Sequence, residues 1–298
     1  WSRSAGEERA VVATSSPTVL RRWIALELRK LRESTGTSRQ QTAQRLRCAV
    51  STVTHFEIAR NLPKAAELEI LLDFYGVAER TESFLELLTA ARKGKDWWLP
   101  FAGTAPPWFD LFLGLETSAA QIESYEALTI TGLFQTEAYA EAVIRTGNPE
   151  LSDHDVAQRI ELRMARQDVL ARQPNPPTVW SVLDESVLHR LAARPRVMRE
   201  QLEHLAKLAD LPTINIQVLP MAAGISAGMN GTFTLLSFPP ELVGDPGVVY
   251  TESLIKGTYY EDPTEIMCYR NTLTRLQIQA ATPEQSHTII TRRAEEMT

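Results

Sequence analysis

Cysteine is nearly absent from this sequence, which contains only Cys48 and Cys268 among 298 residues. Two thiols so far apart are not a disulfide framework and are typical of a reducing cytosol. No run of 18 apolar residues occurs, which excludes a membrane-spanning helix. Residues 1–16 mix four charged residues with one short apolar stretch, so we expect no signal peptide there. Because the first residue is not methionine, we expect the numbering to begin inside a longer native chain.

Metal-binding spacing is lacking as well. The five histidines are scattered, and neither an H-x-x-x-H nor a C-x-x-C pattern occurs. His204 falls on the polar side of a predicted helix, where a solvated side chain is the simpler interpretation. No glycine-rich phosphate loop is present. The sequence therefore predicts no metal site and no cofactor.

Positive charge is concentrated in one segment of an acidic chain. Residues 18–64 contain ten lysines and arginines and three acids, a net charge of +7, whereas the whole chain has −6. Residues 1–17 are balanced, so the rest of the chain carries −13. This asymmetry favours a polyanionic partner for the basic segment alone. The alternative is an ordinary solvated helix surface, since basic helices are common.

The first 95 residues have helical periodicity throughout. Ser16 and Pro17 form a start signal, an N-cap residue followed by proline at the first helical position. The first helix runs from there to Gly36, and the others are predicted over 39–46, 51–58, 64–75 and 79–93. Five short helices in this span predict an all-α five-helix bundle over residues 18–93.

The composition changes after a linker at 93–96, and we expect a second domain over 96–298. Helices are predicted over 108–124, 135–145, 152–171, 196–210 and 264–280, with a further one starting at Pro283. Segments rich in Val, Ile, Thr and Phe predict strands over 178–183, 214–219, 232–238 and 248–252. We expect a mixed α/β (α+β) domain with a mainly antiparallel sheet and helices on one side.

Two of the N-terminal helices, 39–46 and 51–58, are joined by only four or five residues, so they must cross steeply. Ala43, Leu46, Val53 and Phe56 then face inward, which leaves the outer face of the second helix exposed. That face carries Ser51, Thr52, Thr54 and His55, polar groups that can approach base edges. Arg39 begins the first helix of the pair, where a guanidinium and a helix N-terminus together suit a phosphate.

The segments R-Q-Q-T-A-Q-R-L at 39–46 and V-S-T-V-T-H-F-E-I-A-R at 50–60 resemble the helix-turn-helix of phage-repressor (XRE-type) regulators. The resemblance implies that Glu57 braces the bundle. Thr42 stands where the family usually has Leu, which weakens the packing of the first helix. Ala59 stands where Gly usually takes a left-handed turn, so we expect that turn to be rebuilt. Together, the residues predicted to contact DNA are Arg39, Val50, Ser51, Thr52, Thr54, His55 and Arg60.

Residues 128–140, L-T-I-T-G-L-F-Q-T-E-A-Y-A, resemble the P-G-L-L-Q-T-x-x-Y-A segment of actinobacterial WhiJ-like regulators, as do 182–185, 214–220, 231–233 and 249–252. The resemblance implies an antitoxin-like regulator that pairs a helix-turn-helix with this domain, often beside a small partner protein. Two positions depart from the pattern, Thr131 in place of Pro and Ser226 in place of a frequent His.

Residues 224–228 fit the G-x-S-x-G pattern of serine hydrolases, with Asp245 or Asp262 and His287 following in the required order. That chemistry needs the serine on a strand-to-helix turn, and here a loop leads from Ser226 into another predicted strand. A flexible loop is the competing interpretation, and hydrolysis is a remote alternative.

A sensory pocket is the other open possibility for the second domain. Six polar residues fall near the resembling segments and are candidates to line it, although they could equally hold the fold together: Tyr125, Gln135, Tyr139, Asp184, Glu185 and Tyr260. No ligand is identified by this pattern.

From these patterns we expect a cytoplasmic, sequence-specific transcription regulator and not an enzyme. Residues 18–93 would bind double-stranded DNA, and 96–298 would form a homodimer and receive a signal from a small effector. An antitoxin-like protein that holds a small protein encoded nearby is the alternative, and no membrane is expected as a partner.

Overall fold

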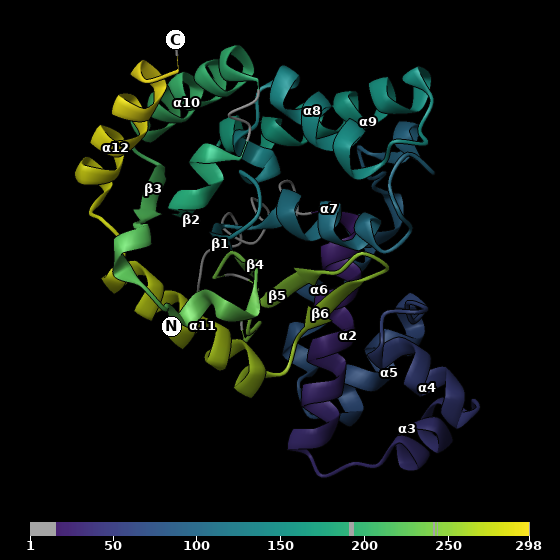
Figure 1. The fold of residues 1–298 in the computed structure, drawn as a ribbon. Coiled ribbons are helices and arrows are strands. Elements are labelled where there is room, and N and C mark those ends of the chain that lie inside the picture. Colours follow the sequence, from purple (N-terminus) through teal and green to yellow (C-terminus); the bar gives the residue numbers. More distant parts are fainter. Residues whose placement is uncertain (1–15, 191–193, 241, 243, 298) are drawn as a thin grey trace. The chain divides into compact units, whose positions relative to one another are not determined.

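The computed structural model describes residues 16–190, 194–240, 242 and 244–297 (Figure 1). The chain folds into two compact units, an N-terminal unit (Trp1–Leu99 with Pro239–Asp245) and a C-terminal unit (Pro100–Phe238 with Pro246–Thr298). The stretch 239–245, which the sequence division placed in the second domain, therefore packs with the first. The expectation of no signal peptide falls outside the described residues, apart from Ser16. None of the described helices is both long and apolar enough to cross a bilayer.

Local signals in the sequence set the helices of the N-terminal unit. Ser16 accepts a hydrogen bond from the Val19 amide, and Pro17 occupies the first turn. Ser38 and Gln41 form a capping box at the start of the next helix, which begins at Arg39. The helical elements are α2 (Pro17–Ser34), α3 (Arg39–Leu46), α4 (Val50–Glu57), α5 (Ala65–Phe74), the 3-10 turn η1 (Ala78–Arg80) and α6 (Thr81–Lys93).

The core of the N-terminal unit lies among α2, α5 and α6. Leu20, Ile24 and Leu28 recur on one face of α2 and are buried. Trp23 packs on Phe84 of α6, with 5.3 Å between ring centroids. A face that buries this many large side chains holds the bundle together mainly through the hydrophobic effect.

The C-terminal unit is built on a six-stranded mixed sheet with the order β3-β2-β1-β4-β5-β6. The strands are β1 (Gln121–Glu126), β2 (Thr178–Asp184), β3 (Ile214–Leu219), β4 (Phe233–Ser237), β5 (Val248–Glu252) and β6 (Gly257–Tyr260). β1, β2 and β3 pair in parallel, and β1, β4, β5 and β6 pair antiparallel. The expectation of a mainly antiparallel sheet was therefore wrong.

The physical reason lies in the connections. Long helical segments join β1 to β2 and β2 to β3, and such crossovers return the chain to the same end of the sheet, which makes parallel neighbours. The sequence analysis also assigned residues 121–124 to a helix, whereas they form part of β1 at the centre of the sheet. Without this strand the parallel half of the sheet could not be recognised.

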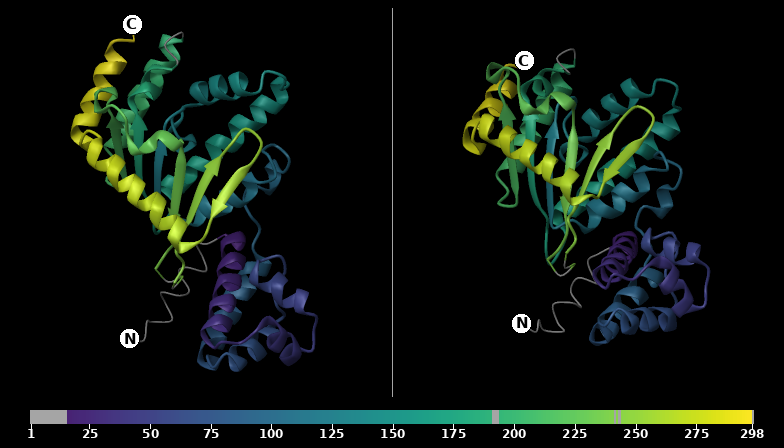
Figure 2. Two further views of the ribbon diagram at one scale, coloured as in Figure 1. Left: turned by 60° about the horizontal axis from the view of Figure 1, so that its bottom comes forward. Right: turned by 90° about the horizontal axis from the view of Figure 1, so that it is seen from below.

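Helices cover both faces of the sheet, not one face as expected (Figure 2). On one face, Tyr125, Phe233 and Val249 pack against α11. On the other face, Tyr250 packs against Phe112 of α7, with 4.5 Å between ring centroids. The helices are α7 (Phe109–Ser118), α8 (Glu137–Gly147), α9 (Asp153–Arg166), α10 (Pro195–Ala209), α11 (Pro263–Gln279) and α12 (Pro283–Glu295). The 3-10 turns are η2 (Leu99–Phe101), η3 (Gly132–Phe134), η4 (Gln167–Ala171), η5 (Glu185–His189), η6 (Met221–Ala223) and η7 (Ala227–Asn230).

Candidate nucleic-acid interface

Helices α3 and α4 form a tight helix-turn-helix. The turn between them starts at Arg47, which has a left-handed backbone with φ 53°. Ala43 on α3 and Val53 and Phe56 on α4 are buried, as the sequence predicted for the inner face. Burial of this face fixes how the two helices cross and leaves the opposite side of α4 in solvent.

The exposed side of α4 carries the residues that the sequence singled out. Ser51 and His55 are four residues apart, and so lie on the same face one turn from each other. Ser51 is exposed and His55 is half-buried, whereas Val50 is 46% exposed. Thr54 lies beside this face and its hydroxyl donates to the Val50 carbonyl at 3.2 Å. The face is thus made of short polar groups, one imidazole and one exposed branched apolar side chain.

Thr52 points away from this face. Its side chain is half-buried, and it forms a hydrogen bond that opposes the rise in the pKa of the Cys48 thiol caused by burial. The structure therefore places Thr52 against the turn, whereas Ser51 and His55 remain free to meet a partner. Its predicted role at a base edge stays a prediction.

Glu57 ties α4 to the rest of the N-terminal unit. Its side chain is 2% exposed and forms ion pairs with Arg32 of α2 and Arg39 of α3. The hydrogen bonds that Arg32 donates to Glu57 raise the pKa of the Arg32 guanidinium, against the opposing effect of burial. A buried carboxylate between two guanidinium groups fixes three helices relative to one another. The bracing role that the resemblance implied for Glu57 fits this geometry.

Arg39 was predicted to contact phosphate, and the structure gives it a second role. Its Nε donates to Glu57 at 2.7 Å, and its side chain is 40% exposed. No described residue accepts a hydrogen bond from its other guanidinium nitrogens. Arg39 can therefore brace α4 and present the outer edge of its guanidinium to a phosphate at once.

The two departures from the helix-turn-helix pattern are accommodated locally. Thr42 is fully buried, and its hydroxyl lies 3.2 Å from both the Ser38 carbonyl and the Tyr75 hydroxyl, so the polar group is satisfied. Ala59 keeps the left-handed conformation with φ 57°. The turn is not rebuilt, contrary to our expectation, because the hydrogen bonds around it already fix the backbone. The backbone amides of Arg60 and Asn61 both donate to the His55 carbonyl.

Basic residues surround the exposed face of α4. Arg47 at the turn and Arg60 after α4 are both exposed. Much of the remaining positive charge of the unit is engaged internally: Arg29 pairs with Glu33, Lys30 with Glu27, and Arg45 with Asp73. The sequence analysis counted Arg47 in the basic segment but did not include it among the residues predicted to contact DNA.

The six residues proposed for a sensory pocket have structural partners in the C-terminal unit. Tyr125 and Tyr139 are buried, and the Tyr139 hydroxyl accepts from the Ile130 amide. The amide group of Gln135 donates to the Ile130 carbonyl at 2.6 Å. Asp184 accepts from the Ser186 amide, Glu185 accepts from the Met221 amide, and the Tyr260 ring packs on Tyr269. Their role in binding an effector stays a prediction.

The residues of the hydrolase pattern are engaged in separate places. Ser226 accepts a hydrogen bond from the Gly228 amide and starts a 3-10 turn, not an α-helix. Asp262 caps α11 through the amides of Thr264 and Glu265. His287 lies 3.7 Å from Asp210, and Asp245 pairs with Arg22 in the N-terminal unit. Among the described residues no group of three or more His, Cys, Asp or Glu side chains has the arrangement of a metal site.

Comparison with known families assigns both parts of the chain. Residues 109–292 match the family model described as a domain of unknown function, DUF5753, and this match covers more than half of the chain. Residues 23–84 match the model of a helix-turn-helix domain, which contains α3, α4 and the turn between them. No curated protein and no solved structure matches the chain.

Proposed function

The chain belongs to the DUF5753 family and carries a helix-turn-helix domain, and from this premise we propose that it is a sequence-specific transcription regulator that reads the DNA major groove with α4. The observation that carries the proposal is the face of α4 described above. One side of the helix is buried, and the other presents Ser51 and His55 between the exposed Arg47 and Arg60. Short polar groups flanked by cations are the pattern of a helix that reads bases and is held by phosphates.

The dimensions of α4 suit this role. An α-helix with its side chains is about 10–12 Å across, which a major groove about 12 Å wide admits, and the eight residues of α4 extend over roughly 12 Å along it. His55 can donate to or accept from a base edge, and Val50 offers methyl groups to a thymine methyl. The guanidinium groups of Arg39, Arg47 and Arg60 are proposed to meet phosphates on either side.

We further propose that the functional unit is a homodimer. One recognition helix of eight residues contacts too few base pairs to select a site, whereas two helices can read half-sites about 34 Å apart, one turn of DNA. The segment outside residues 1–64 carries −13, so its self-association has to rest on apolar contacts and not on charge pairing. Light scattering of the full chain at micromolar concentration tests this, and a monomer both on and off DNA would contradict it.

The experiment that tests α4 compares two substitutions in the full chain. His55→Ala should weaken binding to a selected site by about 1–3 kcal/mol and relax the preference at one base pair. Arg47→Ala should weaken binding to selected and scrambled duplexes alike and reduce the salt slope by about one per subunit. Arg39→Ala is less informative because it also removes a partner of the buried Glu57.

Arg199→Gln serves as the matched control, because Arg199 is an exposed arginine on α10 that pairs with Glu203. The selected site is obtained by repeated enrichment of random duplexes on the full chain, and affinities are measured at three salt concentrations. Equal losses on both duplexes for His55→Ala, or no loss at all, would show that α4 does not read the groove.

A further inference from the structure

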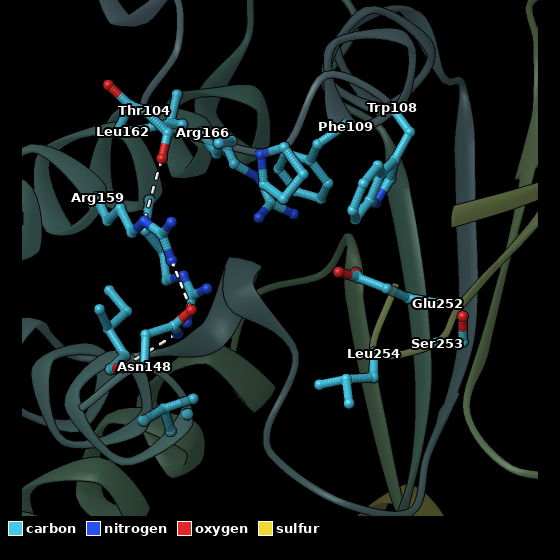
Figure 3. Close-up of a pocket in the computed structure, with 16 residues that line it drawn as sticks. Thr104, Trp108, Phe109, Asn148, Arg159, Leu162, Arg166, Glu252, Ser253 and Leu254 are labelled. Atoms are coloured by element: carbon cyan, nitrogen blue, oxygen red, sulfur yellow. Dashed lines mark hydrogen bonds between the residues drawn. The ribbon is translucent and has the colours of Figure 1, made fainter. Parts of the chain in front are cut away.

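The C-terminal unit contains a cavity of about 350 Å³ between α7, α8, α9 and the β5–β6 hairpin (Figure 3). This volume lies in the range of about 300–1,000 Å³ that small-molecule sites occupy. Three arginines of α9 line it, Arg159, Arg163 and Arg166, spaced so that they fall on one side of the helix. Trp108, Phe109 and Leu254 provide an apolar wall. The cavity is lined by none of the six residues that the sequence suggested for a sensory pocket.

The three arginines differ in how their charge is compensated. Arg166 is buried and forms a two-pronged ion pair with Glu116, at 2.9 and 2.8 Å, so its charge is neutralised. Arg159 donates to the Thr104 carbonyl at 3.1 Å and to the Asn148 side-chain oxygen at 3.0 Å. Arg163 donates to the Gln135 side-chain oxygen at 2.9 Å. Among the described residues, no carboxylate lies within ion-pair distance of Arg159 or Arg163.

Arg159 and Arg163 are therefore oriented by neutral acceptors, and their positive charges stand together at the cavity. Burial and the neighbouring Arg166 lower the pKa of Arg163 to about 10. Glu252 is the carboxylate that faces them across the cavity, but it is exposed and accepts a hydrogen bond from Tyr250 at 3.0 Å. Two adjacent cations that are held in place by neutral acceptors, without a direct ion pair among the described residues, make a preformed site for an oxyanion.

The wall opposite α9 also has an unused polar group. The indole Nε1 of Trp108 is buried and has no hydrogen-bond partner among the described residues. Its neighbour in the ring, Cδ1, lies against the hairpin, so the indole offers the cavity its apolar ring and not this donor. Gly257 makes room for this indole, because a Cβ at that position would come within 2.7 Å of its Cδ1 atom. The tryptophan is therefore held at the cavity by the hairpin.

We propose that this cavity binds a small organic anion, a carboxylate or phosphate ester on an aromatic body, with its oxyanion at Arg159 and Arg163 and its ring against Trp108 and Leu254. An inorganic anion would use the arginines alone and leave the apolar wall unused. The proposal concerns binding by the C-terminal unit, and it does not depend on DNA recognition by α4.

The test uses the full chain, four probes and calorimetric titration. Phenyl phosphate and phenylacetate represent the two oxyanions, inorganic phosphate lacks the aromatic body, and benzyl alcohol lacks the charge. We expect at least one of the two aromatic anions to bind with a dissociation constant below about 1 mM, and the other two probes to bind at least tenfold more weakly. Failure of both aromatic anions to bind at 10 mM overturns the proposal, as does equal binding of inorganic phosphate or benzyl alcohol.

Substitutions locate the site. Arg163→Gln should weaken binding of the aromatic anion by about 10- to 100-fold, which is the range for loss of a charge-assisted hydrogen bond. Arg163 also donates a hydrogen bond to Gln135, so its substitution changes contacts inside the C-terminal unit. A second pair of variants therefore changes only exposed residues. Leu254→Asp places a negative charge at the cavity wall. Ile255→Asp changes the next residue, which does not line the cavity and is also exposed. The exposed fractions of the two residues are 96% and 76%. Leu254→Asp should abolish binding and Ile255→Asp should retain it, and equal effects of the two would overturn the proposed location.

Discussion

The two units of this protein differ in where they place cations that have no ion-pair partner among the described residues. The N-terminal unit keeps Arg47 and Arg60 on its surface around a helix with short polar side chains. In the C-terminal unit, Arg159 and Arg163 line a cavity and are oriented by neutral acceptors. Exposed cations attract a large polyanion from solution, whereas cations at a cavity select a small one that fits. Together the two proposals give one chain that binds anions on two scales.

Removing Glu57 should have the largest effect of any single change in the N-terminal unit. Glu57→Ala leaves Arg32 buried without this carboxylate, and loss of one partner from a buried ion pair costs about 3–5 kcal/mol of unfolding free energy. Urea denaturation of the full chain measures the loss. Glu69→Ala, at an exposed position of α5, is the control and should change stability by less than about 0.5 kcal/mol. Equal stability of the two variants would contradict the bracing role.

Glu126 allows the opposite experiment in the C-terminal unit, where removal of a charge should stabilise. Burial raises the pKa of Glu126 to about 8, although Ser124 and Arg166 oppose the shift. Because the folded-state pKa is above the unfolded value, the native state holds the extra proton, and stability falls as the pH rises from about 4.5 to about 8.

Glu126→Gln removes this pH dependence. It should raise the unfolding free energy at pH 9 by up to about 5 kcal/mol, since the rise from 4.5 to about 8 is about 3.5 pKa units and each unit corresponds to about 1.4 kcal/mol. At pH 4 the variant and the parent should be nearly equal. Urea denaturation across this range measures both, and a variant that is less stable than the parent at pH 9 would show that the carboxylate is ionised and paired in the fold.

A smaller loss is expected from filling the space beside Trp108. Gly257→Ala places a methyl group 2.6 Å from the Tyr250 ring and 2.7 Å from the indole, and overpacking of this kind costs about 1–3 kcal/mol. Gly147→Ala is the matched control, because nothing lies within 4 Å of a Cβ at that helical position. Thermal melting compares the two variants. If the Gly257→Ala and Gly147→Ala variants have the same melting temperature, the hairpin does not hold the indole in place.

The smallest effect is predicted at the turn after α4. Ala59 has a left-handed backbone, which costs a non-glycine residue about 1–2 kcal/mol. Glycine avoids this strain in the folded state, but it loses more conformational entropy on folding, which offsets part of the gain. Ala59→Gly should therefore stabilise the N-terminal unit by about 0.5–1 kcal/mol in urea denaturation. Ala66→Gly, at an exposed position inside α5 where the backbone is helical, should destabilise by up to about 1 kcal/mol. Destabilisation by both would mean that Ala59 contributes through contacts and not through strain.

Sequence reasoning succeeded where the signals are local. The pattern of residues 39–46 predicted α3 with its observed bounds, and the structure adds a capping box of Ser38 and Gln41, because such signals act within a few residues. Sequence reasoning failed where an element depends on partners that are distant in the chain. β1 contains the polar residues Glu123, Ser124 and Glu126 and therefore resembled the end of a helix. Its character comes from strands more than 50 residues away.

The candidate sites follow the same division. Ser51 and His55 could be placed on one face from spacing alone. The cavity could not be predicted, because Arg159 and Arg163 look like solvated residues of an amphipathic helix. Only the fold brings them opposite Trp108 and Leu254. Arg163 has two arginines and no acid three or four residues away on α9, and this is the one signal that could have raised the question.

The discontinuity of the N-terminal unit has a consequence for its synthesis. Asp245, whose side chain is 2% exposed, pairs with Arg22 of α2, although 222 residues separate them in the chain. A ribosome that has released the helix-turn-helix must therefore complete all of strands β1 to β4 before this ion pair can form. The DNA-binding unit reaches its final form late in translation, and a fragment ending at residue 99 lacks a part of its own structure.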